Sequence, residues 1–244
     1  MARVLLPLVT PDEIRECLSL GPWSFLAAPA RVTQNPNWPR GGRGPGEVMS
    51  LLNAWVSPKR ALVAVDTDGL LVGSGEHFSF SKLIPLAHAR TVIAARGDAA
   101  FLHCLFTYYF TTNRAEVSRD YDAMAAHALH AIAVAQGHWK MNSAANTPYQ
   151  FVMVGWSPAK GRMVGLRFKG ETDDVGTDQE DLEQLIAPEV DGCQGIQPTN
   201  DTNMIRLAGP QSRWLREQGA AGGGELIIAE LSKSAIDIRI RPIR

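Results

Sequence analysis

The sequence is poor in cysteine and contains no long apolar run. Three cysteines among 244 residues, an odd number without a CxxC pair, indicate neither a disulfide framework nor a zinc site. No stretch approaches the roughly 18 apolar residues that a membrane-spanning helix needs. Acidic residues from Asp12 onward come too early for a signal peptide. We therefore expect a protein of the cytoplasm with no membrane partner.

The sequence also lacks an excess of charge of either sign. It has 24 basic and 25 acidic side chains, a formal net charge of -1. Without a global positive field, we expect no nucleic-acid partner. Apolar side chains make up 45% of the residues, enough to fill the core of one large domain. No pattern of metal ligands or of a cofactor site stands out, so we expect no metal and no cofactor.

Residues 1–49 have the character of an appendage, an N-terminal arm or leader. Thr10 is followed by a proline and two acidic residues, which predicts a short helix to about Leu20. From Pro22 to Gly46, proline and glycine recur too often for a helix or a central strand. Large apolar residues such as Trp23 would suit an extended arm that grips a partner.

Residues 50 to 97 contain three short β-rich runs, which are SLLNAWVS, RALVAVD and TVIAARG. Turn-forming residues separate them, so we expect three neighbouring antiparallel strands. After Gly97, apolar residues cover most of the circumference of a predicted helix that includes Phe101 to Phe110. A second helix, rich in alanine, should run from about Tyr121 to Gln136.

The second half returns to a β pattern. The runs YQFVMVGW and MVGLRFKG should form a hairpin around residues 157–161. The acidic segment of about 171–203 is expected to be a surface insertion that includes a short helix, DQEDLEQLI. A helix from about Gln211 to Gln218, a break at AAGGG, a helical stretch through Glu230 and a last strand, DIRIRPIR, should complete the chain.

This order of strands, helices, strands and helices indicates the fold class. Two sheets packed face to face with helices outside both give every amphipathic layer a partner. We therefore predict an α+β fold, a four-layer αββα sandwich formed by residues 50–244, with an N-terminal extended arm formed by residues 1–49.

At RALVAVDTDG, SKLIPL and TVIAARGDAAFL, the sequence resembles the proteasome β-subunit and bacterial proteasome-like peptidases, of the N-terminal-nucleophile (Ntn) hydrolase superfamily. In that family a threonine, an aspartate and a lysine are sixteen residues apart, and Ser50, Asp66 and Lys82 have the same spacing. The resemblance implies that Ser50 is the nucleophile and that Asp66 and Lys82 support it. It also implies that a backbone N–H, that of Ala95, faces the oxyanion.

The chemistry explains why these residue types are needed. A serine at a free chain end can use its own α-amine, with a pKa near roughly 8, as the general base. Lys82 would keep the hydroxyl proton labile, and Asp66 would hold Lys82 protonated and oriented. The resemblance implies peptide-bond hydrolysis after removal of residues 1–49.

The residues around Ser50 lead to a second hypothesis. The family nucleophile is usually preceded by glycine, whereas Ser50 lies between Met49 and Leu51. This departure favours a catalytically silent structural or adaptor subunit of a larger assembly, such as a phage tail or another virus particle. The partners would be copies of the same chain or other proteins, bound through the N-terminal arm. Asp66 and Lys82 would then be a strand-end ion pair.

Overall fold

The fold is known from a computed structural model. It describes residues 2–5, 50–70, 76–97, 99–111, 117–142, 147–172 and 176–243. The predicted helix at residues 10–20 and the proline- and glycine-rich arm lie outside these ranges. Within them, no helix is long and apolar enough to cross a membrane.

A six-stranded antiparallel sheet has the strand order β1-β10-β9-β8-β7-β6. Its strands are β1 (Ala2–Leu5), β6 (Leu83–Leu86), β7 (Thr91–Arg96), β8 (Pro148–Ser157), β9 (Arg162–Glu171) and β10 (Gly176–Asp181). The hairpin predicted around residues 157–161 is its β8–β9 pair, which confirms that prediction. Strand β1 comes from the segment predicted to be an arm and pairs with β10, a strand that the sequence did not suggest.

A five-stranded antiparallel sheet has the order β11-β2-β3-β12-β13. Its strands are β2 (Leu52–Val56), β3 (Arg60–Asp66), β11 (Gln184–Ala187), β12 (Glu225–Ser232) and β13 (Ile236–Pro242). The predicted strands β2, β3 and β13 are confirmed. A small separate pair, β4 (Asp68–Leu70) and β5 (His77–Ser79), follows β3.

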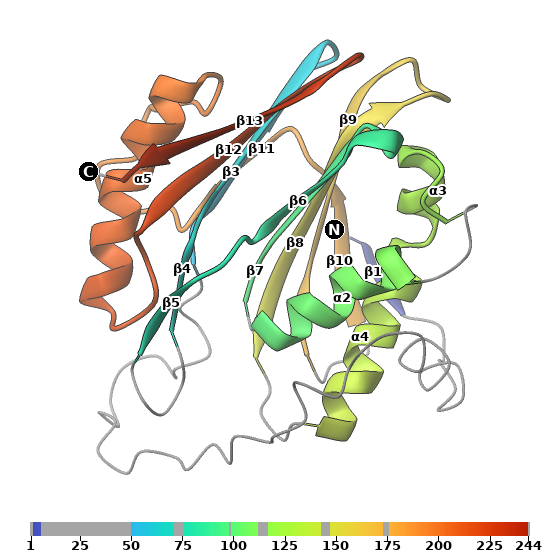
Figure 1. Cartoon of the computed structure of the whole chain (residues 1–244), viewed down its shortest axis with the longest axis horizontal. Coiled ribbons are helices and arrows are strands. Elements are labelled where there is room, and N and C mark those ends of the chain that lie inside the picture. The colour runs from blue at the N-terminus through green and yellow to red at the C-terminus, as the bar shows by residue number, and fades with distance from the viewer. Residues whose placement is uncertain are drawn as a thin grey trace.

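Helices cover the outer face of each sheet (Figure 1). On the six-stranded sheet these are α2 (Ala99–Thr111), α3 (Tyr121–Ala126) and α4 (Ala128–Asn142). On the five-stranded sheet it is α5 (Asp201–Glu217), which begins earlier than predicted because Asn200 accepts a hydrogen bond from the Asn203 N–H as its N-cap. The two predicted helices after Gly97 are confirmed, although the second is divided at His127.

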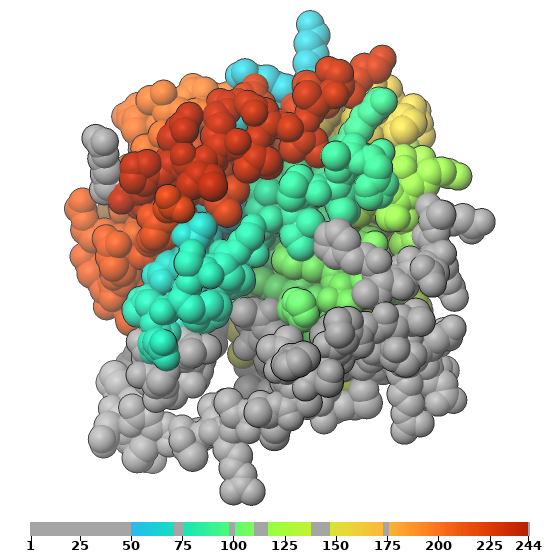
Figure 2. Space-filling view, in the orientation of Figure 1, coloured from blue at the N-terminus to red at the C-terminus, as the bar shows by residue number. Residues whose placement is uncertain are grey.

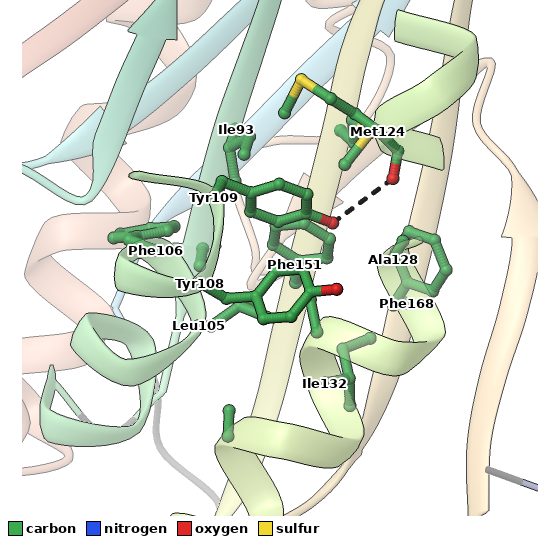
Figure 3. Packing of buried hydrophobic residues seen from close by; sticks show 14 of the residues in the cluster. Ile93, Leu105, Phe106, Tyr108, Tyr109, Met124, Ala128, Ile132, Phe151 and Phe168 are labelled. Carbon is green, nitrogen blue, oxygen red and sulfur yellow. Dashed lines mark hydrogen bonds between the residues drawn. The ribbon is translucent and has the colours of Figure 1, made fainter. Parts of the chain in front are cut away.

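The core between α2–α4 and the six-stranded sheet is rich in aromatic residues (Figure 3). Phe101 stacks on Tyr149 of β8 with 4.7 Å between ring centroids. The Tyr109 hydroxyl donates to the Met124 carbonyl at 3.4 Å, which joins α2 to α3. This core fixes the position of β7 and β8, on which part of the candidate site depends.

A second core lies between the two sheets. The side chains of β7 alternate between this core and the core under the helices. Val92 and Ala94 belong to the core between the sheets, whereas Ile93 and Ala95 belong to the core under the helices. Successive side chains of a strand point to opposite faces, so this alternation is expected. The next residue, Arg96, therefore faces the space between the sheets.

The helix predicted for DQEDLEQLI is wrong. Residues 176–187 instead form β10 in one sheet and β11 in the other, so the predicted insertion contributes a strand to each. On β10, Glu180 pairs with Arg167 and Asp178 pairs with Lys169 of the neighbouring β9. These acidic residues are thus matched by cations distant in sequence, which a local pattern does not reveal.

The helical stretch predicted through Glu230 is also wrong, because those residues form β12. Leu226 and Ile228 pack toward α5, while Ile227 and Ala229 pack between the sheets. A strand buried on both faces shows no alternation of polar and apolar residues, so it resembles a buried helix in sequence.

The run TVIAARG is a strand as predicted, but it is not a neighbour of β3. It forms β7, which pairs with β6 and β8 in the six-stranded sheet. The intervening β4–β5 pair carries the chain from one sheet to the other.

Candidate active site

Ser50 lies two residues before β2, near the end of β3. Leu52 is paired with Val65, so the residues before Leu52 run alongside Asp66. The Leu51 N–H donates to Asp66 Oδ1 at 3.1 Å. Ser50 is 8% exposed, and its hydroxyl makes no hydrogen bond within the described part of the chain.

A buried amide pair holds β2 in place. Asn53 Nδ2 donates to Gln211 Oε1 at 2.8 Å, and Gln211 Nε2 donates to Asn53 Oδ1 at 2.9 Å. Both side chains are fully buried, and Gln211 belongs to α5. The reciprocal bonds attach the start of β2 to the helix.

Asp66 and Lys82 form a buried ion pair. Lys82 Nζ donates to Asp66 Oδ1 at 2.9 Å, and the residues are 1% and 0% exposed respectively. Nζ also donates to the backbone carbonyl of Asp68 and lies 5.3 Å from the Phe80 ring centroid. The structure thus brings together the two charged residues whose spacing was noted in the sequence.

Burial opposes the charge on both members of this pair. It raises the pKa of Asp66 and lowers the pKa of Lys82, and the attraction between the two charges counteracts each shift. Lys82 therefore releases its proton more easily than an exposed lysine does. Such perturbed groups are more frequent at functional sites than elsewhere.

Ala95 does not have the role predicted for it. Its N–H donates to the Lys82 carbonyl at 3.0 Å, one step beyond the Leu83–Ala94 pair of the β6–β7 ladder. Ala95 is also completely buried under the helices. The structure therefore contradicts the prediction of Ala95 as an oxyanion donor, because the sheet already uses this N–H.

A turn formed by residues 222–224, all glycine, contacts the residues after Asp66. In the sequence, this segment was identified only as a break between two helical stretches. The Gly222 N–H donates to Asp68 Oδ2 at 3.0 Å. Gly224 has φ +67, and a Cβ there would lie 2.6 Å from Thr67 Oγ1. Only glycine fits so close an approach. The run of three glycines was the available signal that a backbone contact was needed here.

Arg96 is a further charged residue of the site that sequence reasoning missed. It is 6% exposed, faces the space between the sheets and lines a cavity of about 720 Å³. Burial lowers the pKa of its guanidinium to about 10, while Asp66 acts in the opposite direction. Side chains alternate between the two faces of a strand, so the run TVIAARG places Arg96 on the same face as Val92 and Ala94. This alternation was the sequence signal that could have identified Arg96.

No group of three or more histidine, cysteine, aspartate or glutamate side chains could hold a metal ion in the described ranges. The arrangement places a buried lysine–aspartate pair against the backbone of Leu51, the residue that follows Ser50.

Comparison with known proteins establishes the fold. No family model and no curated protein matches this sequence. Among solved structures, the chain is similar to Anbu from Hyphomicrobium sp. strain MC1, a bacterial proteasome-like protein. The TM-score is 0.55 and the identity 12%, over 80% of this chain and 87% of that chain. The chain therefore has an α+β, proteasome-like fold, related to Anbu at the level of the fold.

Proposed function

We propose that this protein is an Ntn-type amide hydrolase, a four-layer αββα sandwich in which Ser50 attacks the carbonyl carbon of a peptide. The observation that carries the proposal is the buried ion pair of Lys82 and Asp66, anchored to the residue that follows Ser50. Its 2.9 Å contact forms between residues whose spacing matches that of the family.

Three successive cores support the four-layer arrangement. One lies between α2–α4 and the six-stranded sheet, one between the sheets, and one between the five-stranded sheet and α5. The likeness to a proteasome-like protein supports the same arrangement.

The energetics of the pair argue against a purely structural role. Removing two charges from water costs several kcal/mol for each ion, and a well-packed apolar pair of similar volume is often as stable or more stable. Asp66 is completely buried and Lys82 almost so. Retention of such a pair beside a buried serine is better explained by chemistry than by stability.

In the proposed reaction, residues 1–49 are removed, so that Ser50 has a free α-amine. As the Ser50 oxygen bonds to the substrate carbonyl carbon, its proton passes to this amine. The amine then gives a proton to the leaving nitrogen, and the C–N bond breaks to leave an ester on Ser50. Water, deprotonated by the same amine, hydrolyses the ester. Lys82 stabilises the negative charge that develops on the serine oxygen, and Asp66 orients Lys82.

A second candidate function is the catalytically silent structural or adaptor subunit of a larger assembly. The observation that favours it is the hydrogen bond from the Ala95 N–H to the Lys82 carbonyl, which leaves the expected oxyanion donor already bound. Docking through residues 1–49, to copies of the chain or to other proteins, belongs to this candidate.

The test compares two forms of the protein, the full chain and a chain whose translation starts at Met49. Methionine aminopeptidase removes an initiator methionine before a small residue such as serine, so the second form starts at Ser50. We expect intact-mass analysis to show an acyl-enzyme after mixing this form with a peptide p-nitrophenyl ester. The adduct should disappear in Ser50→Ala and persist in Ser57→Ala, a matched serine at the other end of β2.

The opposite result would favour the silent subunit. In that case the full chain keeps its full-length mass under all conditions, and the form that starts at Ser50 gains no acyl group although it is folded by circular dichroism. An adduct that persists in Ser50→Ala would also exclude Ser50 as the nucleophile.

A further inference from the structure

Arg96 is buried without a partner for its charge. It lies at the end of β7 and is 6% exposed. Its Nε is a buried donor without an acceptor, and no hydrogen bond or ion pair joins its guanidinium to any residue in the part of the chain that the structure describes. A buried guanidinium left in this state is costly, because it has lost water without gaining an anion.

The neighbouring cations differ from Arg96, because each has a carboxylate. Arg167 Nη1 lies 2.6 Å from Glu180 Oε1, and the Gln150 side-chain oxygen accepts from Arg167 Nε at 2.5 Å when its amide is oriented to satisfy both groups. Lys169 lies 3.8 Å from Asp178. Only Arg96, of the three described cations that line the cavity, is left without an anionic partner.

Asp66 does not satisfy Arg96. Its Oδ1 already accepts from Lys82 Nζ and from the Leu51 N–H, and its Oδ2 has no hydrogen-bond partner. Its charge stabilises the Arg96 cation through space. Within the group formed by Asp66, Lys82 and Arg96, a single carboxylate therefore balances two buried cations.

The cavity beside Arg96 has the size of a ligand site. Its volume is about 720 Å³, within the range of roughly 300–1,000 Å³ that is typical of small-molecule pockets. One wall comes from the ends of β7, β8 and β9, and the other comes from β11 and the residues up to Glu189. It is therefore an opening between the two sheets.

We propose that Arg96 binds a carboxylate of the peptide substrate, which lies in this cavity while Ser50 attacks the scissile bond. A planar carboxylate matches the guanidinium fork and can accept two parallel hydrogen bonds. The charge of Arg96 lowers the pKa of Lys82 and the charge of Asp66 raises that of Arg96, so the three groups interact through space. The claim that this carboxylate belongs to a substrate rests on the proposed hydrolase function, whereas carboxylate binding itself does not.

The experiment measures binding to the full chain carrying Ser50→Ala, so that turnover does not interfere. The probes are capped pentapeptides of alanine with glutamate or glutamine at the centre, and an uncapped peptide with a free C-terminal carboxylate. We expect at least one carboxylate peptide to bind about tenfold more tightly than the glutamine peptide in calorimetry. The glutamate peptide and the uncapped peptide distinguish a side-chain carboxylate from a terminal one.

Arg96→Met should remove this difference, and Arg213→Met, which changes an exposed arginine of α5, should preserve it. Equal affinity for all peptides, no binding, or a preference that persists in Arg96→Met would overturn the proposal. Arg96-dependent binding without any acyl-enzyme on Ser50 would instead remove the hydrolase function and keep the carboxylate site. Acyl-enzyme formation without a carboxylate preference would keep the hydrolase function and remove the carboxylate site.

Discussion

Arg96 and Arg239 are both arginines on strands, but their surroundings are opposite. Arg239 of β13 reaches three carboxylates, those of Asp201, Glu230 and Asp237. These contacts raise the pKa of Arg239, with the Glu230 hydrogen bond as the largest cause. Burial lowers the pKa of Arg96, for which no carboxylate is within contact in the described ranges. One arginine is satisfied at the surface, and the other is unsatisfied in the interior.

The ion pairs of Arg239 stabilise the fold, whereas the burial of Arg96 without an ion pair does not contribute to stability. Most residues of β13, in red in Figure 2, are exposed at the surface, where water moderates their charges. Arg96 is only 6% exposed and has no ion-pair partner among the described residues, so the burial of its charge opposes folding. Three variants test this comparison.

The largest effect is expected for Lys82→Met, which leaves Asp66 as an uncompensated buried carboxylate. We expect a loss of about 3–5 kcal/mol in the free energy of unfolding, measured by urea denaturation at neutral pH. With Lys82 gone, burial raises the pKa of Asp66 without opposition from the ammonium. The folded state then binds a proton more tightly than the unfolded chain, so the loss should shrink as the pH falls.

The double variant Asp66→Leu with Lys82→Met is the matched control for this prediction. Replacing both charges by apolar groups should recover most of the lost stability, because no charge remains buried. A loss in the double variant as large as in Lys82→Met would mean that packing, and not charge, causes the effect.

Arg96→Met is expected to have an intermediate effect of the opposite sign. Because Arg96 is buried without a counter-ion, its replacement by an apolar side chain of similar length should stabilise the protein by about 1–2 kcal/mol. Thermal and urea unfolding would measure the gain. A clear loss of stability would show that Arg96 has a structural partner and would remove the contrast with Arg239.

The smallest effect is expected for Arg239→Met, a loss of about 0.5–1 kcal/mol that decreases as salt is added. Asp237→Asn serves as its control and should change stability less, because the Asp237 side chain is 65% exposed and two other carboxylates remain on Arg239. A salt-independent loss of several kcal/mol would place Arg239 in the same class as Lys82.

The sequence revealed much of the fold because several elements are specified locally. The β8–β9 hairpin has a turn signal at residues 157–161, and α2 has the continuous apolar surface of a buried helix. Strands β10 and β12 were missed because their burial and their ion pairs depend on residues far away in the chain. The Glu180–Arg167 pair, for example, exists only once β9 and β10 are adjacent.

The candidate site divides in the same way. The spacing of Asp66 and Lys82 anticipated their contact. Asp66 is the last residue of β3 and Lys82 directly precedes β6, so the strands fix the positions of both residues. Ala95 was assigned wrongly because the sequence does not show which N–H groups the sheet uses. Arg96 was missed because an arginine that ends an apolar strand is usually assumed to reach water.

The position of β3 between β2 and β12 has a consequence for the nascent chain. Asp66 pairs in register with Leu226, which the ribosome makes long after Asp66. Until β12 is complete, the Asp66 carboxylate stays hydrated, and the free edge of the β2–β3 hairpin can pair with other chains. Contacts of such long sequence separation form slowly. The burial of the ion pair is therefore completed only after β12 is made, and a polypeptide that stops before β12 is unable to hold the pair away from water.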